Sequence, residues 1–162
     1  MNTRNRAVQN QTEGGFTVLE ILIVIGIMML ISSVVLVSLS QFRARKILDA
    51  SVEVVMIAFS QAHLDTLSSK DDSVYGVALR SNEAIYFKGS VYPGDSDPSN
   101  KRYVFSNAIE IANISLNGAG TYVYFKRFSG GTDQYGTFDV RLKGSTITKT
   151  TVTVSQVGVA AI

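Results

Sequence analysis

One junction decides the fold of this chain: Glu13-Gly14-Gly15-Phe16-Thr17-Val18-Leu19-Glu20 runs directly into Ile21-Leu22-Ile23-Val24-Ile25-Gly26-Ile27-Met28-Met29-Leu30-Ile31. No charged residue occurs from residue 21 to residue 42. A helix needs about 20 apolar residues to cross the hydrocarbon core of a membrane, so this segment is long enough. Glu20 is the exception, because a carboxylate in apolar surroundings is costly and normally has a partner there.

The residue order Gly15-Phe16-Thr17, two further residues and Glu20, followed by an apolar run, resembles the processing signal of type IV prepilins and type II secretion pseudopilins. In that family a prepilin peptidase in the membrane cuts after the glycine and methylates the new N-terminus. The resemblance implies cleavage after Gly15, N-methylation of Phe16, and a role for Glu20 in the docking of subunits during assembly.

The charge of Glu20 has two possible partners. After cleavage, the α-amino group of Phe16 would have a pKa of about 7.7–8.0 and would be largely cationic at neutral pH. Glu20 lies one helical turn away and could stabilise the N-terminus of its own helix. It could instead reach the amine of a neighbouring subunit in a helical bundle, which is the interpretation that the resemblance favours.

Residues 1–15 are predicted to be a leader that is removed, because they are polar and show no helical or strand periodicity. The alternative is a conventional secretory signal that is cleaved at Ser38-Leu39-Ser40. The apolar segment is too long for that signal and contains Glu20. Basic residues flank both ends of the segment, so the expectation of a single-pass protein with its head outside the bacterial inner membrane rests on the resemblance.

Composition excludes several kinds of site. The chain of 162 residues has no cysteine and one histidine, His63, which excludes disulfides, thiol chemistry and sites built from several histidines. A formal net charge of +2 is too small to indicate nucleic-acid binding by itself. The roughly 120 residues beyond the apolar segment are enough for one small domain.

The same helix is predicted to continue to Leu67, because the sequence contains no proline or glycine between residues 43 and 75. Apolar residues recur there at spacings of three and four, which indicates one buried face: Leu48, Val52, Val55, Phe59 and Ala62. The polar residues between them are expected to face solvent or other subunits: Arg45, Lys46, Asp49, Glu53, Gln61 and Asp65.

Residues 43–162 are predicted to form the globular head, and residues 16–42 the half of the helix for membrane insertion and assembly. Alternating segments in the head predict antiparallel strands at residues 75–79, 84–88, 101–105, 109–116, 122–128, 137–142 and 150–155. The alternation slips near Ala112-Asn113, which indicates a β-bulge. We expect an α+β fold in which the apolar face of one sheet covers the helix stripe.

The C-terminal half resembles the minor pseudopilin H (GspH/FimT-like) domain over residues 50–162. The resemblance rests on Phe125, a glycine-rich loop from Gly130 to Gly136, the strand Phe138-x-Val140-x-Leu142, and the ending Val157-Gly158-Val159. Some members of that group bind DNA through arginines beside the last glycine. Here valines flank that glycine, so this DNA-binding activity does not carry over.

Three other groups of residues have a functional and a structural interpretation. The loop from Asp95 to Asn100 offers oxygen ligands for calcium but lacks the glycine and glutamate of an EF-hand, which favours a solvated loop. His63 and nearby Asp65 lie on one helix and cannot form a catalytic triad. Basic residues beside aromatic ones could contact DNA, although an ordinary strand with one wet face explains the same residues: Lys101, Arg102, Lys126 and Arg127.

The sequence therefore predicts a structural protein without cofactor, metal site or enzymatic activity. We expect a subunit that is processed by a prepilin peptidase and assembled with other pilin or pseudopilin subunits into a pilus or secretion pseudopilus, as a minor component. Membrane lipid is the second expected partner. The alternatives are a DNA-uptake pilin and a single-pass membrane protein with a ligand-binding head that never assembles.

Overall fold

The computed structural model describes residues 15–162, so the predicted leader falls almost entirely outside the described residues. The described chain divides after Ser40 into two compact units. Its elements are α1 (Val18–Leu67), a short 3-10 helix η1 (Lys70–Asp72), β1 (Tyr75–Arg80), β2 (Glu83–Lys88), β3 (Lys101–Val104), β4 (Ile109–Leu116), β5 (Tyr122–Tyr124), β6 (Gly136–Leu142), β7 (Lys149–Val154) and β8 (Ala160–Ala161).

Helix α1 confirms the prediction of one long helix and begins two residues later than expected. The hydroxyl oxygen of Thr17 accepts a hydrogen bond from the backbone N–H of Glu20 at 3.2 Å, which satisfies one of the free donors at the helix start. The helix ends at Leu67, where Ser69 adopts a left-handed backbone conformation with φ of 51°. The end of the helix is therefore a change of backbone conformation that involves neither glycine nor proline.

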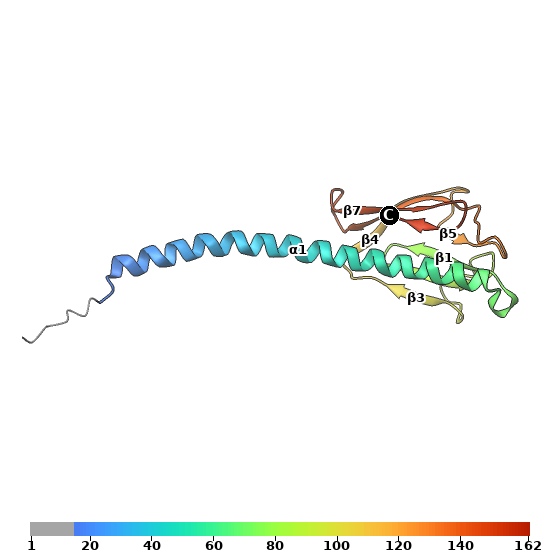
Figure 1. The fold of residues 1–162 in the computed structure, drawn as a ribbon, viewed down its shortest axis with the longest axis horizontal. Coiled ribbons are helices and arrows are strands. Elements are labelled where there is room, and N and C mark those ends of the chain that lie inside the picture. The colour runs from blue at the N-terminus through green and yellow to red at the C-terminus, as the bar shows by residue number, and fades with distance from the viewer. Residues whose placement is uncertain (1–14) are drawn as a thin grey trace, which may run out of the picture. The chain divides into compact units, whose positions relative to one another are not determined.

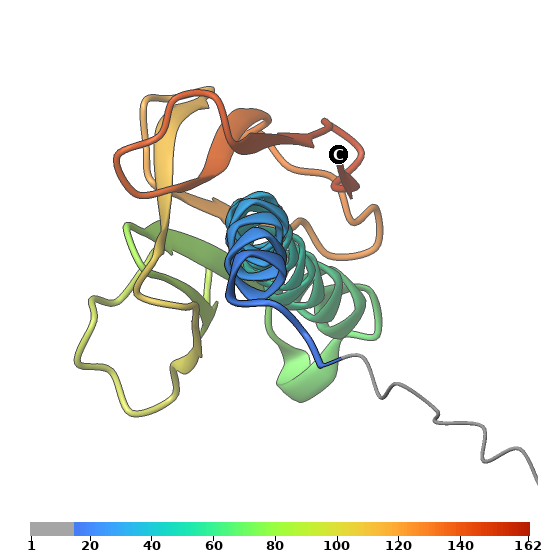
Figure 2. The ribbon, with the colours of Figure 1, turned by 90° about the vertical axis from the view of Figure 1, so that its left-hand side faces the viewer.

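The strands form two four-stranded antiparallel sheets, whereas the sequence was interpreted as one sheet. The first has the order β3-β2-β1-β5 and the second β4-β6-β7-β8. Figure 2 shows the first sheet, mainly green and yellow, and the second, mainly orange and red, on neighbouring sides of the helix. The antiparallel head is confirmed, but its division into two sheets was not predicted, because side-chain alternation identifies the buried face of each strand and not the strand it pairs with.

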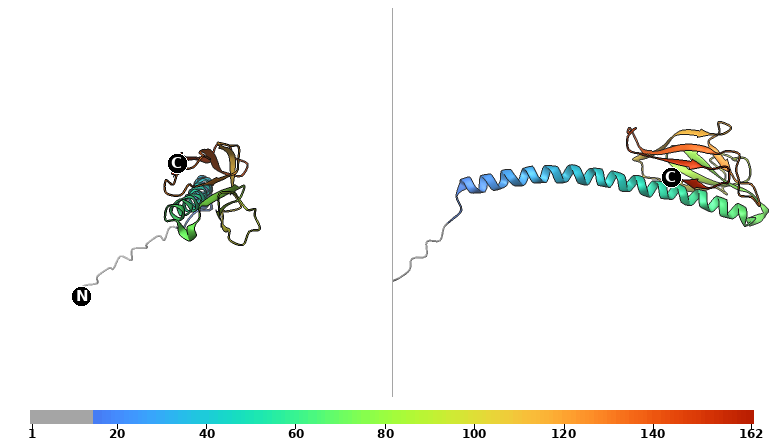
Figure 3. Two further views of the ribbon diagram at one scale, coloured as in Figure 1. Left: turned by 90° about the vertical axis from the view of Figure 1, so that its right-hand side faces the viewer. Right: turned by 45° about the horizontal axis from the view of Figure 1, so that its top comes forward.

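The head has one main core, into which the second part of α1 places its apolar stripe. The whole predicted stripe, Leu48, Val52, Val55, Phe59 and Ala62, is buried. Figure 1 shows this part of the helix running beside the strands, and Figure 3 shows the same packing from two further directions.

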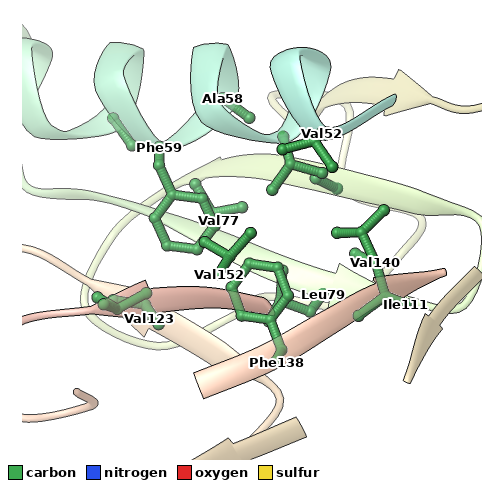
Figure 4. Packing of buried hydrophobic residues seen from close by; sticks show 14 of the residues in the cluster. Val52, Ala58, Phe59, Val77, Leu79, Ile111, Val123, Phe138, Val140 and Val152 are labelled. Carbon is green, nitrogen blue, oxygen red and sulfur yellow. The ribbon is translucent and has the colours of Figure 1, made fainter. Parts of the chain in front are cut away.

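Phe59 lies where the helix meets both sheets. Its ring is stacked on that of Phe138 in β6, with ring centroids 5.8 Å apart, and is edge-on to Phe125, which follows β5, at 6.4 Å. In Figure 4, Phe59 points from the helix toward Val77 and Val152, one from each sheet. The helix therefore contacts both sheets through the side chain of Phe59.

The outer face of the first sheet is also covered. Ala78, Ile85 and Phe87 form a second small cluster, against which Tyr92 and Tyr122 pack. Tyr92 belongs to the loop between β2 and β3, so this loop closes over the sheet. Gly76 makes the packing possible, because a side chain there would overlap the ring of Phe87 and the carbonyl of Val123.

The predicted bulge in β4 is confirmed. The pairing of β4 with β6 shifts between Ala112 and Ser115, and Asn113 has a positive φ of 51°. The side-chain amide of Asn113 donates to Asp139 at 2.8 Å. Asp139 also accepts from Lys149 and Thr151, so the bulge turns an amide toward a buried carboxylate that three groups stabilise.

Strand β5 is shorter than predicted, ending at Tyr124 rather than reaching residue 128. The chain turns after Phe125, and Phe128 has a positive φ of 67° and an exposed side chain. Lys126 and Gly130 close this turn through the backbone, since the N–H of Gly130 donates to the carbonyl of Lys126. Aromatic residues recur up to Phe128 and no glycine or proline intervenes, so the sequence did not mark the end of the strand.

Asp65 was predicted to lie on the wet face of the helix, and this prediction was wrong. Its carboxylate is buried and accepts hydrogen bonds from the hydroxyl of Tyr86 at 2.7 Å, from Gln61 at 2.9 Å and from Lys70 at 3.1 Å. Burial by itself would raise the pKa of Asp65, but these hydrogen bonds outweigh it and lower the pKa below its usual value. Asp65 therefore joins the last turns of α1 to strand β2.

Candidate assembly site

The predicted cleavage site lies outside regular structure. Gly15 and Phe16 precede the first turn of α1, and both are exposed. No other part of the described chain comes within 4 Å of the position where a side chain at Gly15 would begin. A peptidase needs an extended, accessible backbone, and the described residues leave this bond open to one.

Glu20 lies in the first turn of α1. Thr17 and Glu20 have the spacing of a capping box, and one half of that motif is present, the bond from the backbone N–H of Glu20 to the hydroxyl of Thr17. The carboxylate of Glu20 makes no hydrogen bond or ion pair with another residue in the range 15–162. An acid in the first turn is stabilised by the helix dipole, and this carboxylate keeps its full capacity to bind a cation.

The part of α1 before Gln41 is apolar around its whole circumference. The large side chains from Val18 to Leu36 that the structure describes are all exposed within the chain itself. Helix α1 is long and apolar enough to cross a membrane by length and composition alone. Since a helix without a polar face is unfavourable in water, this segment requires a lipid or protein environment.

The part of α1 within the head also exposes large apolar side chains outside the buried stripe. Ile47, Ile57 and Leu64 are exposed, while the predicted stripe is buried. At about 100° per residue, Ile57 and Leu64 lie about 20° apart around the helix and so share one side, whereas Ile47 lies about 80° from Ile57. These exposed apolar residues were not predicted, because the side of the helix away from the core was assigned to polar residues.

The four basic residues with a predicted DNA contact lie in two places. Lys101 and Arg102 belong to β3, and Lys126 and Arg127 follow β5, which are the opposite edges of the first sheet. Three of them make ion pairs: Arg102 with Glu83 at 2.7 Å, Lys126 with Asp133 at 2.7 Å and Arg127 with Asp72 at 2.6 Å. The structure does not bring the two pairs together, and a DNA contact stays a prediction.

The loop from Asp95 to Asn100 uses its carboxylates within the chain. Asp95 accepts hydrogen bonds from Arg80 at 3.0 Å and from Tyr92, and Asp97 accepts from the backbone N–H of Ser99 at 2.8 Å. Among the described residues, no three acidic or histidine side chains are grouped so that they could hold a metal ion. The carboxylates of this loop fasten it over the outer face of the first sheet.

His63 packs against the glycines of the C-terminal half. Its ring lies edge-on to Phe125 with centroids 5.2 Å apart. A side chain at Gly130 would overlap the imidazole, a side chain at Gly158 would overlap the carbonyl of Gly130 and press on the imidazole, and both glycines have a positive φ. The glycine-rich loop and the ending Val157-Gly158-Val159 therefore meet on His63, which gives the histidine a packing role.

Two crystal structures of the type IV minor pilin FimU from Pseudomonas aeruginosa are similar to this chain. The first is 16% identical in sequence with a TM-score of 0.57, and covers 75% of this chain and 91% of FimU. The second is 14% identical with a TM-score of 0.52, and covers 70% and 90%. This chain has a pilin-like fold.

At these identities the similarity concerns the fold and not the chemistry of particular residues. No protein-family model and no curated protein matches the chain. The pilin-like fold agrees with the predicted α+β class, with its long N-terminal helix and antiparallel C-terminal part.

Proposed function

We propose that this protein is a structural subunit that is processed by a prepilin peptidase and assembled into a type IV pilus or a type II secretion pseudopilus, as a minor component. One observation carries the proposal. A pilin-like head is continuous with a helix of 50 residues whose first part is apolar on every side and carries a single carboxylate, Glu20.

The proposal divides the chain into three parts with different roles. Residues 1–15 are the leader, residues 16–42 anchor the protein in the inner membrane and later pack in the filament, and residues 43–162 are the head. An apolar helix is stable in lipid before assembly and in a bundle with the apolar helices of other subunits afterwards, so the same surface serves both states. The role is structural, and no enzymatic activity is proposed.

In this proposal, Glu20 provides the charge that pairs neighbouring subunits during assembly. Cleavage after Gly15 creates a cationic amine on Phe16, and in a bundle of low dielectric constant an unpaired ion is strongly destabilising. A subunit whose Glu20 lies beside the amine of its neighbour neutralises both charges. The contacts of Thr17 are compatible with this arrangement. Its hydroxyl accepts a hydrogen bond from the backbone N–H of Glu20 and not from its side chain, so the carboxylate is available to a neighbouring subunit.

Intact-mass spectrometry of the protein extracted from membranes tests the processing step. We expect the mature chain to begin at a methylated Phe16, and Gly15→Val to retain residues 1–15, because the peptidase requires a small residue before the cut. Gly26→Val, a matched substitution at an open position inside α1, should be processed normally. A mature chain that begins at Gln41 would instead establish the conventional secretory signal.

A further inference from the structure

The second sheet ends on an incomplete edge. Strand β8 has two residues, and they pair only with Thr153 and Val154 at the end of β7. The earlier part of β7, from Lys149 to Val152, pairs with β6 on one side. On its other side, no described strand pairs with it.

The backbone groups of β7 that face this open edge can be identified. The N–H of Ser155 donates to the carbonyl of Val159, so Ser155 points toward β8. Backbone groups alternate between the two edges of a strand, and Thr151 and Lys149 therefore point the same way as Ser155. Their N–H and C=O groups lie beyond the reach of β8 and are open to another strand.

A groove runs beside this open edge. It lies between α1 and β7, has a volume of about 420 Å³, and is lined by Asp49, Val52, Glu53, Met56, Thr150 and Ile162. Ile162 follows β8 directly, so the groove begins where β8 ends. An extended segment that continues the line of β8 would enter it and meet the free backbone groups of β7.

The rim of the groove is acidic. Asp49 and Glu53 lie one helical turn apart on α1, and both are exposed. Neither makes an ion pair with another residue in the described range, although eight ion pairs occur within that range. The apolar lining and this rim together favour a segment that carries both apolar and basic side chains.

We propose that this groove binds an extended segment of a neighbouring subunit, which adds a strand to β7 in line with β8. Backbone hydrogen bonds to Thr151 and Lys149 would provide the pairing, as in other cases of strand addition. An apolar side chain of the segment would fill the space beside Val52 and Met56, and a lysine or arginine would lie beside Asp49 and Glu53. The identity of the partner as a subunit rests on the proposed function.

The test uses the full-length protein in detergent micelles and a fluorescent peptide, blocked at both ends, in which valine and lysine occupy every second position in turn with threonine between them, so that both can face α1. We expect saturable binding by fluorescence anisotropy, and hydrogen exchange at least about tenfold slower in residues 149–152 when the groove is saturated. Two further peptides carry N-methyl groups either on the threonines or on the valines and lysines. Only one of them should lose binding, because alternate N–H groups face opposite edges of a strand.

Two protein variants with the same change of net charge test the acidic rim. Asp49→Asn with Glu53→Gln should weaken binding at least about fivefold. Asp71→Asn with Asp72→Asn is the control, since these residues are exposed, lie far along the chain from the groove, and have positive φ angles that asparagine tolerates. The control should bind like the wild type.

Several outcomes would overturn the inference: no saturable binding, equal binding of both N-methylated peptides, equal weakening in both variants, or a dimer of the protein that excludes the peptide. The result is separate from the test of processing and assembly. A protein that enters filaments but does not bind the peptide contradicts only this inference. A protein that binds the peptide but is never processed contradicts only the proposed function.

Discussion

Asp65 shows how the charge of a residue can mislead when only helical spacing is considered. Its position next to the buried stripe was assigned to the wet face, because a carboxylate is rarely buried. The structure buries it and supplies three donors, of which Tyr86 comes from a strand distant in sequence. A helical pattern contains no information about such a partner, so this position could not have been predicted.

Replacement of Asp65 by alanine is therefore expected to destabilise the head by about 1–3 kcal/mol, since it leaves the buried hydroxyl of Tyr86 without a partner. Asp49→Ala on the exposed rim should change stability by less than about 0.5 kcal/mol. The measurement is thermal unfolding of the full-length protein in detergent, followed by near-ultraviolet circular dichroism of the tyrosines. The combination of Asp65→Ala with Tyr86→Phe should cost less than the sum of the two changes. Additive costs would contradict the bond.

Asp139 predicts a dependence of stability on pH. Hydrogen bonds from Lys149, Thr151 and Asn113 lower the pKa of Asp139 to about 2 from an ordinary value of 3.8. Because the pKa of Asp139 is lowered in the folded state, its ionised carboxylate stabilises the fold fully at pH values above the ordinary pKa. This stabilisation is lost as the pH falls from about 4 to about 2. The contribution is on the order of 2 kcal/mol, because each pKa unit corresponds to about 1.4 kcal/mol.

Acid unfolding of the wild type and of Asp139→Asn tests this dependence. The variant should be less stable at neutral pH, and its stability should fall less steeply between about pH 4 and pH 2. Equal slopes for the two proteins over that interval would show that Asp139 does not carry the effect. The bulge at Asn113 was predictable from the sequence, but its use as a donor to Asp139 was not, because the two residues lie on different strands.

At the scale of secondary structure, helix α1 was the most predictable element. Its length follows from the scarcity of glycine and the absence of proline, and its buried stripe from spacings of three and four. The exposure of three large apolar residues on the same helix, Ile47, Ile57 and Leu64, was missed because the exposed side was assigned to polar residues. Strand positions were also predictable in most cases, since alternation marks them directly.

The stripe can be tested with two substitutions two positions apart. Phe59→Ala should destabilise the head by about 3–5 kcal/mol, because it removes a ring that packs on both sheets. Ile57→Ala, where the side chain is 50% exposed, should cost about 1 kcal/mol or less. The same thermal unfolding measurement compares them. Equal melting temperatures for wild type and Phe59→Ala would show that this face of α1 is not part of the core.

At the scale of the whole molecule, the α+β class could be predicted and the two-sheet arrangement could not. Pairing β1 with β5, and β4 with β6, depends on contacts between segments that are far apart in the sequence. The groove between α1 and β7 was missed for the same reason, because its wall and its open edge come from residues about 100 positions apart. The predicted cleavage site and the proposed role of Glu20 in assembly rest on the resemblance of the N-terminal segment to prepilins.

The central claim is that Glu20 joins subunits, and the incorporation of Glu20→Val into filaments tests it most directly. The measurement compares the amount of protein in shear fractions with the amount in membranes. We predict that Glu20→Val is inserted in the membrane at wild-type levels, since the substitution removes a costly carboxylate, but is absent from sheared filaments. Glu20→Asp, one methylene shorter, should be intermediate. Incorporation of Glu20→Val at the wild-type level would contradict the claim and would leave stabilisation of its own helix as the role of Glu20.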